Sequence, residues 1–307
     1  MNYSIEVRFH PIYELLNSLL SYSNSSFYKK TELGMNWRKA TSSKISKELA
    51  EALNSKQLEH LSYLSEYVLC QPISNKSIDQ VLEDLHNTDE QQVIQFLSEL
   101  HVSKDYLDSH KGTFHETLQL VKKWNEEYFC HIDSNIISSL ERSCEQKRQE
   151  EYDGDSLDFV EKVTNGIVMK GFDKVKKVIL YPVFHSTPII TISHYQHLHC
   201  YGYPVDLPPL AEEEPSPALM RKGIALTDKN RLKILRFLGK EERSFTEIVK
   251  YIGLAKSTVH HHMIILRASG LIQVILSPDT SERFRLREQG LGHIFQNYYQ
   301  YLFPTDL

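Results

Sequence analysis

Cysteine is scarce in this chain, and its few thiols are scattered. Four cysteines occur in 307 residues, and no two of them form a CxxC pair. They are Cys70, Cys130, Cys144 and Cys200. A secreted disulfide scaffold is a much shorter chain with denser cysteines, so this spacing predicts reduced thiols and a cytoplasmic location.

Long apolar runs are also missing. No stretch approaches the roughly 18 apolar residues that a membrane-spanning helix needs. The first residues, "MNYSIEVRFHPIYELL", lack the basic start and apolar core of a secretory signal. We therefore expect neither export nor a membrane partner.

The common catalytic motifs are absent from the first 200 residues, which contain no phosphate-binding glycine loop, no nucleophile elbow and no HExxH. We expect no cofactor and no enzyme activity. One alternative stays open, because five residues of this region have metal-binding chemistry. They are His185, His194, His197, His199 and Cys200.

Imidazoles and a thiolate on neighbouring strands can hold Zn²⁺ or Ni²⁺. Under this alternative the ligands come from His194, His197, His199 and Cys200, and the region is a metal-dependent hydrolase with an accessory nucleic-acid-binding module. His197 and His199 would share one strand face. No carboxylate lies nearby in the sequence, so we prefer to interpret the group as scattered histidines on a β-surface.

Charge is distributed unevenly along the chain. From Ala218 to the C-terminus there are 14 Lys and Arg against 8 Asp and Glu, a formal charge of +6. The preceding residues carry 21 basic and 32 acidic side chains, a charge of −11. An acidic body joined to a basic C-terminal module is typical of a protein that binds nucleic acid.

A change of composition divides the chain into two domains. Five prolines and three consecutive glutamates fall in "YPVDLPPLAEEEPSPALMRKG", residues 203–223, which cannot continue a helix or a central strand. We predict a first domain over 1–203, a linker over 204–223 and a second domain over 224–307.

The first domain is predicted to be helix-rich with a small sheet. A short strand, "IEVRFH", precedes a helix that opens at Pro11. From about residue 41 to 150, apolar residues recur every three to four positions, as packed helices require. The later segments "KKVILYPVF", "PIITISHY" and "HLHCYGYP" are rich in β-branched and aromatic residues and predict two or three strands.

Three short helices are predicted at the start of the second domain. The first lies in "LTDKNRLKILRFLG", with an apolar stripe of Leu226, Leu232, Ile234, Leu235 and Leu238. The second, "SFTEIVKYIG", begins with Ser244 and Glu247 at capping-box spacing. Gly253 supplies the tight turn to the third helix, as a helix-turn-helix needs.

The third helix, Ala255 to about Ala268, contains three consecutive histidines. Successive side chains of a helix lie about 100° apart, so the three cannot all face one metal ion. We expect His262 to be partly buried. We expect Lys256, Ser257, His260, His261 and Ile264 to point outward, with Thr258 at the margin. Hydroxyls and imidazoles at this end of such a helix can meet base edges and phosphates in the major groove.

A hairpin follows in "LIQVILSPDTSERFRLRE", with its turn at "SPDTS". Arg283, Arg285 and Arg287 alternate with Phe284 and Leu286 in its second strand. Because strand side chains alternate between faces, we expect all three arginines on one exposed face. Such a row beside the third helix would contact phosphates.

This module resembles the winged-helix domain of ArsR-type bacterial transcriptional regulators. The resemblance covers Ala225 to Phe303, and "STVHHHMIILRASGLI" is similar to that family's recognition-helix signature. It implies a dimeric repressor or activator whose third helix enters the major groove. With the arginine hairpin, the DNA-binding residues are predicted to be Lys256, Ser257, Thr258, His260, His261, Arg283, Arg285 and Arg287.

Two departures from that family are visible. Ala255 stands where a serine often caps the recognition helix. No cysteine follows Cys200, so metal sensing by the winged helix is unsupported. In layout the chain is similar to longer ArsR-type regulators that carry an uncharacterised N-terminal domain.

Together these patterns predict a mainly α (α+β) fold with a C-terminal winged helix-turn-helix. The predicted function is a sequence-specific transcriptional regulator, for which we expect repression, acting on an inverted repeat in double-stranded DNA. The last helix, "GLGHIFQNYYQYLF", is too apolar to stand alone in water and predicts a partner, either a second chain in a homodimer or the first domain. The first domain would dimerise or bind a small-molecule effector.

Overall fold

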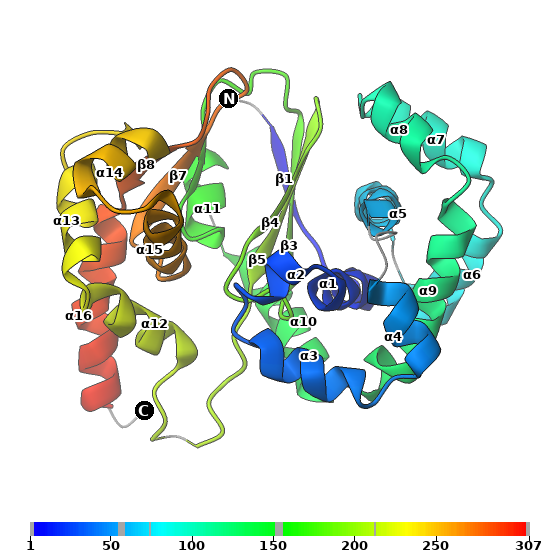
Figure 1. The fold of residues 1–307 in the computed structure, drawn as a ribbon, viewed down its shortest axis with the longest axis horizontal. Helices are drawn as coiled ribbons and strands as arrows, with labels where there is room; N and C mark the ends of the chain where they lie inside the picture. Colours follow the sequence, from blue (N-terminus) through cyan, green and yellow to red (C-terminus); the bar gives the residue numbers. More distant parts are fainter. Residues whose placement is uncertain (1–2, 55–58, 74, 151–155, 212, 305–307) are drawn as a thin grey trace. The chain divides into compact units, whose positions relative to one another are not determined.

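The chain divides into two compact units in the computed structural model, which describes residues 3–54, 59–73, 75–150, 156–211 and 213–304 (Figure 1). The N-terminal unit comprises Asn2–Glu151 and Lys174–Val205. The C-terminal unit comprises Tyr152–Asp173 and Asp206–Leu307. The chain therefore passes between the units three times, whereas the sequence predicted one passage near residue 203.

The sheet of the N-terminal unit has the order β1-β3-β5-β4. Its strands are β1 (Ser4–Val7), β3 (Lys177–Val183), β4 (Thr191–His194) and β5 (Leu198–Pro204). β1, β3 and β5 run parallel, and β4 is antiparallel to β5. β3 and β5 are buried along nearly their whole length, which explains their continuous apolar and aromatic sequence. The strands predicted in this region are confirmed.

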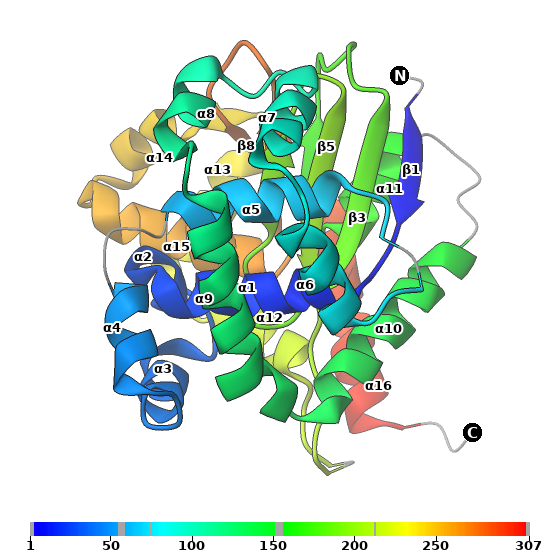
Figure 2. The same cartoon turned by 90° about the vertical axis from the view of Figure 1, so that its right-hand side faces the viewer.

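Helices form the rest of the N-terminal unit. They are α1 (Pro11–Ser23), α2 (Ser25–Tyr28), α3 (Gly34–Ser42), α4 (Lys47–Asn54), α5 (Glu59–Cys70), α6 (Ile78–His86), α7 (Glu90–Glu99), α8 (Lys104–His110), α9 (Phe114–Glu127), the 3-10 turn Phe129–His131 and α10 (Ser134–Gln149). Figures 1 and 2 show α1 and α5 beside the sheet, with α6 to α9 in an outer layer beyond them. α2 and α3 escaped prediction, because α3 buries only Thr41 and has no apolar stripe.

α1 connects the helices of this unit to its sheet. It opens as predicted, with Pro11 in its first turn and the His10 side chain accepting from the Ile12 N–H at 3.2 Å. Its fully buried Glu14 carboxylate accepts from the backbone N–H groups of Phe184 at 3.0 Å and His185 at 2.8 Å, just after β3. These bonds satisfy a carboxylate that would otherwise be costly to bury.

The C-terminal unit contains a second four-stranded sheet with the order β2-β7-β8-β6. Its strands are β2 (Ile167–Met169), β6 (Arg243–Ser244), β7 (Ile272–Leu276) and β8 (Arg283–Leu286). β7 and β8 form the predicted hairpin. β2 pairs in parallel with β7, which is why residues 152–173 belong to this unit and not to the first domain.

Six helices form the rest of the described part of the C-terminal unit. They are α11 (Ser156–Val163), α12 (Pro217–Leu226), α13 (Lys229–Leu238), α14 (Phe245–Ile252), α15 (Lys256–Ala268) and α16 (Glu288–Leu302). α12 begins inside the predicted linker. Pro217 occupies its first turn, where proline is tolerated, and the Ser216 hydroxyl accepts from the Leu219 N–H at 3.2 Å. The apolar stripe predicted for α13 is wider than the buried face observed, because Leu232 is 48% exposed.

Among the described residues, no helix is both long enough and apolar enough to cross a bilayer.

The proposed metal ligands do not assemble in the described part of the N-terminal unit. The register of β4 and β5 places only His194 and His199 together, with their rings stacked 4.1 Å apart. His197 lies before β5, where its Nδ1 is 2.8 Å from the Lys174 carbonyl oxygen, so it does not share a strand face with His199. Cys200 is buried beside Cys70, and the His185 ring is held by Glu14 and Tyr128. No cluster of three metal-binding side chains occurs in the described ranges.

Burial of His199 predicts an acid-sensitive N-terminal unit. Only 2% of this residue is exposed, and burial together with neighbouring His194 lowers its pKa to about 3. The unfolded chain therefore binds this proton more readily, and stability should fall as the pH drops from about 6.5 towards 3, by up to about 1.4 kcal/mol per pH unit. His199→Gln should flatten the dependence of the unfolding midpoint on pH between 6.5 and 5. An equal slope in His199→Gln and the control His197→Gln would contradict this assignment.

Candidate nucleic-acid interface

Local chemistry fixes both ends of α14. The Ser244 hydroxyl accepts from the Glu247 N–H at 3.3 Å, and the Glu247 carboxylate accepts from the Ser244 N–H at 2.8 Å, so the predicted capping box is confirmed. Gly253 ends α14 with φ at +72°, a left-handed conformation that glycine adopts without steric cost. α15 therefore starts at a defined angle to α14.

One face of α15 is packed, and the other is open to solvent. The buried side chains are Val259, His262, Met263 and Leu266. The exposed ones are Lys256, Ser257, Thr258, His260 and His261. Four of these were predicted to point outward, whereas Thr258 was expected at the margin and Ile264, also predicted outward, is half-buried. This outer face combines a cation, two hydroxyls and two imidazoles, all of which can donate hydrogen bonds to base edges or phosphates.

His262 differs from the two histidines before it. It is 7% exposed, and its Nδ1 is 4.0 Å from the Asp228 carboxylate at the start of α13. Burial lowers its pKa, with the Asp228 charge acting in the opposite direction. It therefore packs α15 against the domain, on the opposite face from the exposed His260 and His261.

The start of α15 carries no side-chain cap, because Ala255 has no hydroxyl to accept from the first N–H groups. The positive end of the helix dipole lies at the same end as Lys256 and Ser257. Backbone N–H groups at such a terminus favour a phosphate oxygen. The sequence predicted that the usual serine cap is missing here, and the structure confirms that no side chain caps the start of α15.

Arg285 is the exposed arginine of the hairpin. Its side chain is exposed on β8, while its neighbour Phe284 is buried. Within the part of the chain that the structure describes, Arg285 has no acidic partner. Its guanidinium is therefore available for a phosphate.

Arg283 is less available than the sequence predicted. One of its guanidinium nitrogens donates to the Glu242 carbonyl oxygen at 2.8 Å and lies 3.7 Å from the Glu247 carboxylate. Its side chain is 40% exposed. The hydrogen bonds with Ser244 lower the pKa of Glu247 to about 2, so this carboxylate stays negative and offsets part of the Arg283 charge.

Arg287 is buried, and its predicted place in an exposed row is wrong. β8 ends at Leu286, and Arg287 is the residue before α16, so the strand alternation no longer applies. Its Nε donates to Glu161 at 2.6 Å, one Nη donates to the other Glu161 oxygen at 3.2 Å, and the second Nη donates to the Asn165 side-chain oxygen at 2.6 Å. Arg287 is therefore a positioning residue for the domain and not a phosphate contact.

Sequence reasoning missed the segment that receives Arg287. Glu161 belongs to α11, and Gly166, just before β2, has a φ of +124°. A Cβ at Gly166 would lie 2.6 Å from the Ile272 carbonyl oxygen, so only glycine permits this approach of β2 to β7. The one local signal was "TNG" before an apolar "IVM". Three apolar residues are too short a pattern to predict a strand, and the partner strand lies more than 100 residues further along the sequence.

Comparison with known proteins covers only part of this unit. Residues 228–274, which run from the cap of α13 into β7, match the family model of bacterial regulatory proteins of the arsR family. No curated protein and no solved structure matches the chain. The chain thus contains an ArsR-family helix-turn-helix domain, the DNA-binding part of a transcriptional regulator.

Proposed function

We propose that the chain is a sequence-specific repressor that acts as a homodimer on an inverted repeat. The observation that carries this proposal is the outer face of α15, where five polar side chains are exposed opposite a packed apolar face. A helix of this kind fits the major groove, and Arg285 on the adjacent hairpin supplies a contact to the backbone. A dimer bound at a promoter would exclude RNA polymerase, and transcription would therefore be repressed.

We propose that the chain acts by binding and not by catalysis. The rival hydrolase needs a set of metal ligands, and within the described ranges only His194 and His199 of the four candidates lie side by side. Its DNA target would place the protein in the bacterial cytoplasm.

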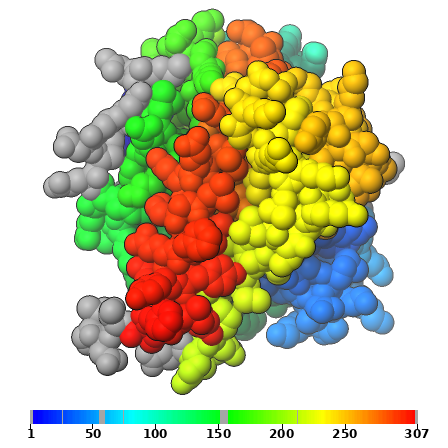
Figure 3. All heavy atoms as spheres, turned by 90° about the vertical axis from the view of Figure 1, so that its left-hand side faces the viewer, coloured from blue at the N-terminus to red at the C-terminus, as the bar shows by residue number. Residues whose placement is uncertain are grey.

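A homodimer is supported by the exposed side of α16. Phe295, Tyr299 and Leu302 are 84%, 65% and 62% exposed, and their spacing of four and three residues places them on one helical face. In Figure 3 α16 (red) lies along the surface of the C-terminal unit that faces the viewer. Apolar side chains gathered in this way mark a protein interface. In a two-fold dimer each α16 would meet its own copy, and two recognition helices would be presented about one helical turn of DNA apart.

Selection of bound sequences from a random DNA pool tests this proposal directly. The full chain should enrich an inverted repeat. Ser257→Ala and His261→Ala should relax the preference at individual positions of each half-site, since one good base contact discriminates by about 1–3 kcal/mol. His293→Ala, at an exposed histidine of α16, is the control and should return the wild-type repeat. An enriched site without two-fold symmetry would contradict the dimeric arrangement.

Removal of the Arg285 charge should weaken binding to all DNA sequences alike. We expect Arg285→Ala to reduce the slope of log affinity against log salt by about one for each protomer, because one phosphate contact is lost. Arg142→Ala removes the same charge from an exposed position on α10 and should leave the slope unchanged. Equal slopes for Arg285→Ala and wild type would show that the hairpin does not touch phosphate.

Charges on the apolar face of α16 should separate the dimer. Phe295→Glu combined with Tyr299→Glu would place four unpaired carboxylates in the interface, so sedimentation should show a monomer. Gln289→Glu combined with Gln300→Glu adds the same charge at exposed positions away from this face, and it should remain a dimer. A dimer in both double variants would exclude this face as the interface.

A further inference from the structure

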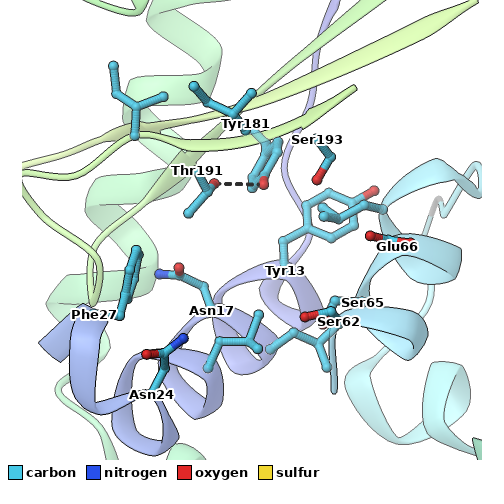
Figure 4. A pocket seen from close by; sticks show the side chains of 15 residues that line it. Tyr13, Asn17, Asn24, Phe27, Ser62, Ser65, Glu66, Tyr181, Thr191 and Ser193 are labelled. Carbon is cyan, nitrogen blue, oxygen red and sulfur yellow. Dashed lines mark hydrogen bonds between the residues drawn. The ribbon is translucent and has the colours of Figure 1, made fainter. Parts of the chain in front are cut away.

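A cavity of about 340 Å³ lies within the N-terminal unit, between α1, α2, α5 and the β3–β4 side of the sheet (Figure 4). Its volume falls at the lower end of the roughly 300–1,000 Å³ that small-molecule sites occupy. Tyr13, Leu16 and Leu20 line it from α1, Phe27 from α2 and Tyr181 from β3. These side chains give it a mostly apolar and aromatic wall.

Three polar groups at this cavity are buried without a hydrogen-bond partner among the described residues. They are the Tyr13 hydroxyl, the Ser65 hydroxyl and one carboxyl oxygen of Glu66. Tyr13 and Ser65 are only 2% and 5% exposed. Buried polar atoms are nearly always hydrogen-bonded, and leaving one unsatisfied costs free energy. A molecule bound in the cavity could supply the missing partners of all three atoms.

The two ends of the cavity differ in charge. Glu66 is the one acidic or basic side chain among the fifteen residues that line it, and in Figure 4 its carboxyl lies at the opposite end from Phe27. Burial raises the pKa of Glu66 to about 7. Burial also raises the pKa of Tyr13 to about 12, so its hydroxyl remains a donor.

We propose that this cavity binds a small organic cation, with its ammonium group against Glu66 and its apolar body against the rings of Tyr13, Tyr181 and Phe27. An ammonium donates up to three hydrogen bonds, and the Glu66 carboxylate and the hydroxyl oxygens of Ser65 and Tyr13 can accept them. The aromatic faces add attraction for a cation. The net charge of −11 before Ala218 also favours a cationic ligand over an anionic one.

The chain itself offers a route from this cavity to the second sheet. Tyr181, in the cavity wall, belongs to β3, and β3 follows β2 after residues 170–176. β2 is a strand of the sheet that contains the hairpin with Arg285. We therefore expect the ligand to alter DNA binding. This expectation rests on the proposed function, whereas ligand binding does not.

Calorimetric titration of the full chain tests the binding site without DNA. The probes are 2-phenylethylamine, the nearly isosteric neutral 2-phenylethanol and the anionic 3-phenylpropanoate. The amine should bind at least tenfold more tightly than the alcohol, and the carboxylate should not bind. Glu66→Gln should abolish the advantage of the amine and retain the alcohol, while Glu83→Gln, at an exposed position of α6, should behave as wild type.

A second variant keeps the proposal testable if Glu66→Gln fails to fold. Ser62→Leu places a larger apolar side chain at the cavity wall and should block amine and alcohol alike. The proposal is overturned if the amine does not bind at millimolar concentration, if it binds no better than the alcohol, or if both Glu66→Gln and Ser62→Leu bind it normally.

The regulatory consequence has its own measurement. On the selected repeat, the amine should change the affinity of the wild type at least fivefold and leave that of Glu66→Gln unchanged. A chain that binds amine but no DNA would refute the proposed function and leave the site intact. A chain that binds both without mutual effect would refute the coupling alone.

Discussion

The buried pair between Arg287 and Glu161 determines the architecture of the DNA-binding half of this chain. It is a two-point interaction with further bonds to Asn165 and Gln273, and it joins residues 126 positions apart. Removing one partner of such a pair typically costs about 3–5 kcal/mol, because the other charge stays buried. The pair holds α11 and β2 against the hairpin, and it fixes where α16 begins. Arg285 lies two residues before this pair, and α16 begins one residue after it.

Local chemistry made the recognition helix predictable. The Ser244–Glu247 cap, Gly253 and the spacing of Val259, Met263 and Leu266 all act within a few residues. Most of the outward positions of α15 were therefore predictable, and only the margins of its exposed face, at Thr258 and Ile264, were not. Arg287 was mispredicted because strand alternation says nothing about where a strand ends. Arg287 is buried because it pairs with the Glu161 carboxylate of α11, and no local sequence pattern predicts a partner 126 residues away.

The N-terminal unit shows the same limit of prediction. Its strands were predictable from β-branched and aromatic content, but their parallel order and the register that separates His197 from His199 were not. The cavity was equally hidden, since Tyr13 and Glu66 lie on different helices and meet only after α1 and α5 pack against the sheet. In sequence, Glu66 is an ordinary helical glutamate.

The threefold passage of the chain between its units has a consequence for folding. A gene fragment starting at Asp206 would encode the ArsR-family match but omit β2 and Glu161, exposing the open edge of β7 and stranding the Arg287 charge in an apolar interior. The residues that match the ArsR family therefore do not form a complete folding unit by themselves. Their sheet and the partner of the Arg287 charge both depend on residues that precede the N-terminal unit's last three strands in the sequence.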